Sequence, residues 1–62
     1  MIVEVDVFEV QLVDRITKKV IKTYDAGMDY DKALQIQDQW NLAYVNGTNY
    51  TKIETYYDEI EE

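Results

Sequence analysis

Carboxylates are the side chains of this sequence whose types and spacing could do chemistry. Asp25, Asp29 and Asp31 lie within one short stretch. Two adjacent carboxylates can act as a general acid and base, and three can bind calcium, but the stretch lacks the glycine and the terminal glutamate of an EF-hand loop. Asp29 also stands where a helix N-cap is expected, and Asp31 where an acid favours the helix dipole. We therefore interpret these carboxylates as structural.

The other groups that enzymes use are scarce. The sequence contains no histidine, no cysteine and no serine. The usual catalytic triads cannot form without them, and zinc or iron would have carboxylate ligands alone, which is unusual. Threonine and tyrosine hydroxyls remain, but no neighbouring base marks one of them as an activated nucleophile. We therefore predict that the protein is not an enzyme and that it has no catalytic residue, metal site or cofactor.

Charge is unevenly distributed along the chain. The sequence has 13 acids and six bases, for a formal net charge of −7. Four of the bases lie between Arg15 and Lys22, whereas the segment from Glu54 to Glu62 holds five acids and no base. An acidic protein is repelled by nucleic acid and by anionic membranes, so we expect neither as a direct partner. The basic segment suits a solvated edge strand, or it pairs with the acidic tail of the same or a neighbouring subunit.

The length of 62 residues sets a limit on the core. A domain of this size buries only about 60% of the surface that its unfolded chain exposes. Without a disulfide or a metal, such a domain needs a very well packed core or a partner subunit. The absence of cysteine fits a reducing compartment, and the sequence shows neither a signal peptide nor a membrane span. We expect a single cytoplasmic domain that comprises residues 1–62.

The first stretch of the chain, Ile2–Val13, predicts the central strand of a small sheet. Its apolar side chains change face midway, because alternate residues of a strand point to opposite faces. One face holds Val3, Val5 and Val7, and the other holds Phe8, Val10 and Leu12. A β-bulge near Val7–Phe8 would re-aim the side chains in this way. Alternatively, both faces are partly covered, one by a helix and the other by a partner.

The remaining elements follow from turn signals and hydrophobic periodicity. Polar residues at Asp14–Lys19 predict a hairpin turn, in which Lys18 occupies a position that often holds a left-handed glycine or asparagine. The elements predicted after this turn are a strand at Val20–Asp25, a helix at Tyr30–Val45, a strand at Asn49–Tyr57 and a short, frayed acidic tail at Asp58–Glu62.

The helix pattern decides the fold class. Residues at three- and four-residue steps form one buried stripe, which comprises Ala33, Ile36, Gln37, Trp40, Ala43 and Tyr44. Leu42 lies nearly opposite this stripe, and Asn46–Gly47 ends the helix with one of the two residues in the left-handed conformation. The sequence therefore predicts an α+β fold of ββαβ order. Its three-stranded antiparallel sheet has the strand order 2-1-3, and the helix packs on one face.

Tyrosines form the most suggestive surface feature. Six tyrosines are too many for the core of so small a domain, and tyrosine is enriched at protein interfaces. Several of them lie beside acids near the carboxyl terminus. We predict that this surface binds a basic groove of a partner protein, where carboxylates replace phosphates and exposed aromatic side chains replace bases. The predicted partner-binding residues are Glu54, Tyr56, Tyr57, Asp58, Glu59 and Glu61.

Two stretches resemble small early proteins of bacteriophages in topology and composition. They are the hairpin F-E-V-Q-L-V-D-R-I-T-K-K-V-I-K-T-Y-D and the helix start M-D-Y-D-K-A-L, which together cover about 40% of the chain. In a general way the chain resembles the small phage inhibitors of uracil-DNA glycosylase, which are acidic dimers built from a sheet and a helix. It also resembles small anti-CRISPR and other host-takeover proteins. The resemblance implies a host protein as the partner, and it carries no functional residue over to a numbered position.

Two functions from different classes follow. In the first, the protein is a non-enzymatic, phage-encoded inhibitor in the host cytosol that binds a nucleic-acid-handling protein through a negative, DNA-mimic-like surface. In the alternative, it is a small structural or assembly module that homodimerises through its uncovered sheet face or edge. The predicted self-association residues are Val3, Val5, Val7 and Leu42.

Overall fold

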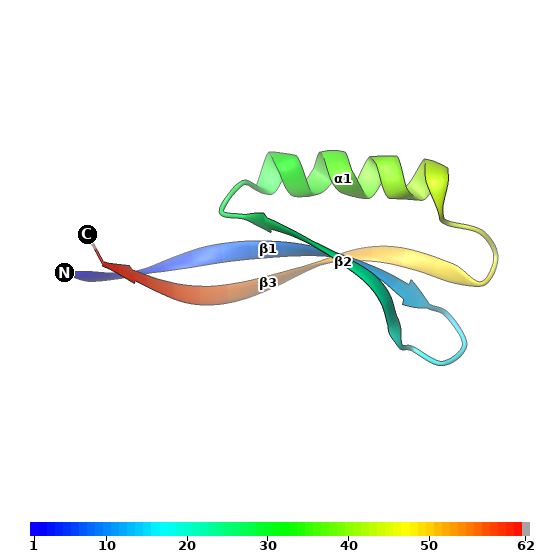
Figure 1. Ribbon diagram of the computed structural model, residues 1–62, viewed down its shortest axis with the longest axis horizontal. Coiled ribbons are helices and arrows are strands. Elements are labelled where there is room, and N and C mark those ends of the chain that lie inside the picture. The colour runs from blue at the N-terminus through cyan, green and yellow to red at the C-terminus, as the bar shows by residue number, and fades with distance from the viewer. Residues whose placement is uncertain (62) are drawn as a thin grey trace.

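A three-stranded antiparallel sheet with one helix on one face makes up the protein (Figure 1). The computed structural model describes residues 1–61. Its elements are β1 (Ile2–Asp14), β2 (Val20–Gly27), α1 (Tyr30–Ala43) and β3 (Asn49–Glu61). The strand order is β2-β1-β3, and both neighbouring pairs are antiparallel. The predicted α+β fold of ββαβ order, with the strand order 2-1-3, is confirmed.

The central strand β1 is regular along its whole length. It pairs with β3 from Ile2 to Asp14 without a register shift. Both irregularities lie in the pairing with β2, where Ala26 and Ile21 are the extra residues. A bulge in β1 near Val7–Phe8 is therefore not the reason why the apolar side chains change face. The strand itself is regular, and the apolar residues simply move from odd positions (Val3, Val5 and Val7) to even positions (Phe8, Val10 and Leu12).

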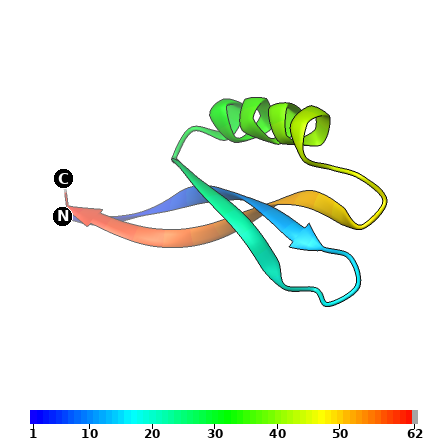
Figure 2. The same cartoon turned by 45° about the vertical axis from the view of Figure 1, so that its right-hand side comes forward.

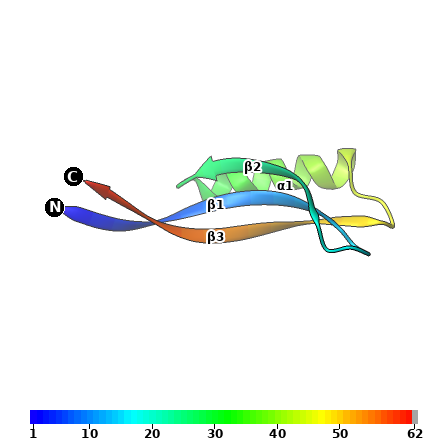
Figure 3. The same ribbon diagram turned by 60° about the horizontal axis from the view of Figure 1, so that its bottom comes forward.

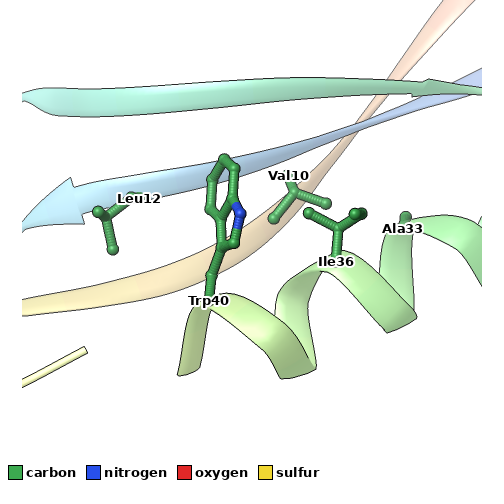
Figure 4. Packing of buried hydrophobic residues seen from close by; sticks show 5 residues of the cluster. All are labelled: Val10, Leu12, Ala33, Ile36 and Trp40. Carbon is green, nitrogen blue, oxygen red and sulfur yellow. The ribbon is translucent and has the colours of Figure 1, made fainter. Parts of the chain in front are cut away.

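The core lies between the second half of β1 and the helix. Val10 and Leu12 of β1 point toward Ala33, Ile36 and Trp40 of α1 (Figure 4). These five side chains are all buried. The rings of Trp40 and Tyr44 pack in a T-shaped arrangement, with their centres 6.1 Å apart. The predicted stripe centred on Trp40 is thus confirmed from Ala33 to Trp40.

The end of the helix differs from the prediction. The helix ends at Ala43 and not at Val45. Ala43 and Tyr44, the last two residues of the predicted buried stripe, are exposed. Neither Asn46 nor Gly47 has a positive φ, and the left-handed positions are Lys18 and Gly27. The reason is that the carbonyls at the helix end have other donors. The Trp40 carbonyl accepts hydrogen bonds from the Tyr44 and Val45 N–H groups at 2.8 and 3.1 Å, and the Tyr44 carbonyl accepts one from the Asn49 side-chain amide at 3.1 Å, so a left-handed cap is unnecessary.

The start of the helix follows the prediction. Asp29 is the N-cap, and its carboxylate accepts a hydrogen bond from the Lys32 N–H at 3.0 Å. Asp31 lies in the first turn, where a negative charge favours the helix dipole. The interpretation of both carboxylates as structural groups therefore agrees with their positions.

The carboxyl-terminal strand is longer than predicted. Residues 58–61 pair with Val5 to Ile2 of β1, so they are not a frayed tail. A polar, acidic run looks mobile in the sequence, but here the backbone of β1 supplies hydrogen-bond partners that do not depend on side-chain type. Glu62, the last residue of the predicted tail, lies outside the described residues.

The long strands project beyond the rest of the molecule. Strand β2 pairs with β1 only from Phe8 to Val13. The segments 2–7 and 56–61 therefore form a two-stranded ribbon, which we call the arm (Figures 1, 2 and 3). Both termini lie at its far end, and the turn between β1 and β2 lies at the opposite end of the molecule. The protein is accordingly elongated, with extents of 46 × 22 × 11 Å.

The core predicts which substitution the fold tolerates least. We expect Trp40→Ala to lower the free energy of unfolding by about 3–5 kcal/mol, because it leaves a cavity beneath the helix. That loss approaches the total stability of about 3–9 kcal/mol typical of a domain of this length. Leu42→Ala, a control on the exposed side of the same helix, should change the value by no more than about 0.5 kcal/mol. Urea denaturation of both variants measures the difference. Equal effects would contradict this position of the core.

Candidate functional site

The two faces of the arm have different chemistry. Residues that pair across an antiparallel ladder point to the same face, so the register between β1 and β3 assigns every side chain. The acidic face comprises Ile2, Glu4, Asp6, Tyr57, Glu59 and Glu61. The valine face comprises Val3, Val5, Val7, Tyr56, Asp58 and Ile60. The acidic face continues the helix side of β1, and the valine face continues the side that the helix does not cover.

Like charges stand opposite one another on the acidic face. Glu4 pairs directly with Glu59, and Asp6 pairs with Tyr57. Side chains at such positions have Cβ atoms about 4.5–5.5 Å apart, at which distance like charges repel. The ring of Tyr57 lies among these carboxylates and is 79% exposed. The face therefore combines closely spaced negative charge with one accessible aromatic ring.

The arm carries most of the net charge of the protein. Its five carboxylates belong to Glu4, Asp6, Asp58, Glu59 and Glu61, and no base lies in either segment. From Phe8 to Thr55 the chain has seven acids and six bases, so this larger part has a net charge of only −1. The negative field is accordingly concentrated at one end of an elongated molecule.

The predicted partner-binding residues do not form one surface. Tyr57, Glu59 and Glu61 share the acidic face, whereas Tyr56 and Asp58 lie on the valine face and Glu54 lies farther along that side. Glu54 is paired with Lys52 at 2.7 Å. The hydrogen bond from Lys52 to this carboxylate raises the pKa of the lysine. The prediction grouped these residues because they are close in sequence. In a strand, however, successive side chains point to opposite faces, so neighbours in sequence do not share a surface.

Two acids of the acidic face were not among the predicted partner-binding residues. Glu4 and Asp6 lie in the first strand, more than 50 residues from Glu59 along the chain. Their alternation with valines signals a strand with one polar face. Only the register shows that this polar face joins the acids of β3, because a shift of one residue would move every side chain to the other face.

The predicted self-association residues are separated as well. Val3, Val5 and Val7 lie side by side on the valine face, each half-buried. Leu42 is 91% exposed on the helix, which covers the other side of the sheet. Leu42 therefore cannot belong to the same contact surface as the three valines.

Tyr56 is held at the base of the arm. The buried Gln11 donates a hydrogen bond through Nε2 to the Tyr56 hydroxyl at 3.2 Å and another to the Glu9 carboxylate at 2.8 Å. These contacts fix the orientation of the Tyr56 ring, and they show that Glu9, Gln11 and Tyr56 share one face. The valine face thus begins at an ordered polar cluster.

The turn at the other end of the molecule is basic and well ordered. We call residues 15–19 the basic turn. The carboxylate of Asp14 accepts hydrogen bonds from the N–H groups of Ile16 and Thr17 at 2.8 and 3.0 Å. The predicted left-handed conformation at Lys18 is confirmed, with φ of 63°. The Arg15 N–H donates to the Thr48 carbonyl at 2.8 Å, which ties the turn to the loop after the helix.

The cations of this region lie on aromatic rings. Arg15 and Lys18 stand 5.4 and 5.6 Å from the centre of the Tyr50 ring. Lys22 instead lies on the helix side, where its ammonium is 4.6 Å from the Tyr44 ring centre. The basic segment from Arg15 to Lys22 is therefore divided, and Lys22 does not belong to the basic turn.

The structure also bears on metal binding and on membranes. Asp25 accepts a hydrogen bond from the Gly27 N–H at 2.8 Å, so this carboxylate has a structural partner. Within residues 1–61, no three acidic side chains converge as a metal site would require. None of the helical residues described belongs to a segment with the length and apolar character to cross a bilayer.

Comparisons with known proteins add no relative. No family model matches the chain, and neither the curated proteins nor the solved structures contain a match. The arm and the basic turn are therefore interpreted from their own chemistry.

The Asp14 cap predicts a pH dependence of the turn. The backbone hydrogen bonds from Thr17 and Ile16 hold the pKa of Asp14 below its ordinary value of 3.8. Because the folded pKa is lower than the unfolded one, the cap stabilises the turn above pH 3.8 and is lost as the pH falls through the lowered pKa. An NMR titration of the Asp14 carboxyl carbon should show a midpoint below 3.8.

The same titration has an internal control. In the Asp14→Asn variant, the Ile16 and Thr17 amide signals should no longer follow this transition, because the titrating group is absent. A midpoint at or above 3.8 in the native protein would contradict the capping role.

Proposed function

We propose that the protein is a non-enzymatic, acidic protein-binding module that inhibits a nucleic-acid-handling partner. In this proposal, the acidic face of the arm occupies the basic surface on which the partner binds nucleic acid. The general resemblance to small phage inhibitors points to the same class of partner. The module would therefore act by competition and would need no chemistry of its own.

The observation that carries the proposal is the density of charge on the arm. Six residues of a strand span about 17 Å, and the acidic face presents four carboxylates over that length. This is about one charge per 4 Å, which is similar to the spacing of about 3.4 Å along one strand of DNA. A basic groove that has evolved to bind phosphates at this density would meet a comparable density of negative charge.

Tyr57 supports the proposal independently of charge. Proteins that bind single-stranded nucleic acid stack successive bases on aromatic side chains and surround the backbone with positive charge. The Tyr57 ring is exposed and stands opposite Asp6 on the acidic face. A ring among carboxylates can fill a base pocket while its neighbours pair with the surrounding cations.

The shape of the molecule favours the arm over the remainder as the contact surface. The arm extends past both β2 and the helix, so it can enter a groove without a collision with them (Figure 3). The larger part of the chain is nearly neutral and has its carboxylates at Asp14, Asp25 and Asp29 engaged as caps. Negative charge that is free to contact a partner is thus found mainly on the arm.

Affinity capture from a bacterial lysate tests this function. The test variant is Glu4→Gln/Glu59→Gln, which neutralises one facing pair on the acidic face. The control is Asp31→Asn/Asp38→Asn, which removes the same charge from the exposed surface of the helix. We expect the native protein and the control to capture a nucleic-acid-binding protein. An added oligonucleotide should release this protein, because the arm and the oligonucleotide compete for the same basic surface. Each surface ion pair contributes about 0.2–1 kcal/mol, so the test variant should bind about two- to thirtyfold more weakly.

The salt dependence and the stability of the variants complete the test. Binding should weaken as salt increases, because salt screens contacts between exposed charges. The test variant should be at least as stable as the native protein, since it removes a repulsion between facing carboxylates. The proposal is wrong if the captured proteins bind no nucleic acid, or if the test and control variants lose affinity equally.

A further inference from the structure

We propose that the valine face of one copy binds the basic turn of a second copy, so that the protein assembles head to tail. This inference goes beyond the proposed function and does not depend on it. It concerns the opposite face of the arm and a partner of known chemistry, a second copy of this chain.

The valine face is an apolar part of the sheet that the helix does not cover. Val3, Val5 and Val7 form a row, with Tyr56 and Ile60 on the adjacent strand. The helix lies on the other side of the sheet, over its opposite half (Figures 1 and 3). A two-stranded ribbon on its own is only marginally stable in water. A partner that buries the valines would therefore stabilise the arm as well as the contact.

Charge determines which surface can cover the valines. Each arm has five carboxylates and no base, so two arms repel one another as they approach, and their valine faces would bring the two Asp58 carboxylates into one contact. Like charges that face one another across a contact are destabilising. The basic turn has the opposite sign, with cations at Arg15, Lys18 and Lys19. A second copy is thus attracted by its turn and repelled by its arm.

The basic turn also offers an apolar group. Ile16 lies at the turn and is 82% exposed, with the three cations close to it in sequence. The valine face has the matching arrangement, in which Asp58 stands opposite Val5 among apolar neighbours. An exposed apolar side chain on a basic turn would therefore meet an apolar row that carries a carboxylate. Contacts of this kind, with a buried apolar centre and a charged rim, are typical of protein interfaces.

The turn is ordered before it binds. Asp14 holds the N–H groups of Ile16 and Thr17, and Arg15 is tied to Thr48. Lys18 keeps a left-handed conformation that glycine would adopt without strain. A preorganised surface loses less conformational entropy when it binds, which favours association.

The contact has to form between two copies. The arm and the basic turn lie at opposite ends of β1, which spans about 40 Å from Ile2 to Asp14. An arm cannot fold back onto its own turn within this rigid strand. Because the two surfaces differ, each copy keeps one free arm and one free turn after the first contact. A heterologous contact of this kind produces a ring or an open series of oligomers instead of a closed dimer.

Sedimentation velocity with two complementary variants tests the assembly. The turn variant is Ile16→Thr/Lys19→Gln, which leaves the arm intact. The arm variant is Val5→Thr/Asp58→Asn, which leaves the turn intact. Asparagine keeps the side-chain oxygen that accepts the hydrogen bond from the Glu59 N–H. Circular dichroism establishes that both variants are folded.

The expected results are specific to the head-to-tail contact. The native protein should form dimers and larger species as its concentration rises at low salt, and these should dissociate as salt is added. Each variant alone should self-associate at least about tenfold more weakly. An equimolar mixture of the variants should form a 1:1 dimer and nothing larger, because the mixture has one intact arm and one intact turn per pair.

Other outcomes would overturn the inference. A native protein that remains monomeric at millimolar concentration and low salt has no such contact. A turn variant that still associates, or an association that strengthens with salt, would indicate pairing between arms. Each of these results leaves the proposed function intact, because the lysate experiment neutralises residues of the acidic face only.

Discussion

The uninterrupted pairing of β1 with β3 is the constraint on which the rest of the structure depends. All thirteen residues of β1 have a partner on β3, whereas β2 pairs with the second half of β1 alone. The ladder assigns each side chain to a face. It therefore places Val10 and Leu12 beneath Trp40, and it separates the valines of the arm from the acids of the arm. One register produces both the core and the two outer surfaces.

The features that the sequence predicted correctly depend on local or strongly patterned signals. Asp29 precedes a helical pattern and satisfies amide groups within its own turn. Ala33, Ile36 and Trp40 recur with the period of a helix, and Lys18 stands at a turn position that demands an unusual φ. The strand order follows because the crossover between β2 and β3 brings the last strand beside the first.

The features that could not be predicted depend on contacts between distant residues. Residues 58–61 read as a mobile acidic tail, since nothing in their own sequence supplies a partner. They are strand because Ile2–Val5 pairs with them from the other end of the chain. The division of the predicted surface has the same cause. Tyr56 and Tyr57 are neighbours in sequence, yet the register places them on opposite faces, and only a pairing partner more than 40 residues away fixes this register.

The composition of the arm is not what the stability of the fold alone would favour. Farther along the ladder Glu54 also stands opposite Glu9, but there Lys52 pairs with Glu54 at 2.7 Å and Gln11 donates a hydrogen bond to Glu9 at 2.8 Å. On the arm, Glu4 stands opposite Glu59, and Asp58 stands among valines. A lysine at any of these positions would relieve repulsion and keep the strand intact. Sites where a sequence departs from such local rules are the places where function is expected. The arm departs from them on both faces, which is why both interactions proposed for the protein are located there.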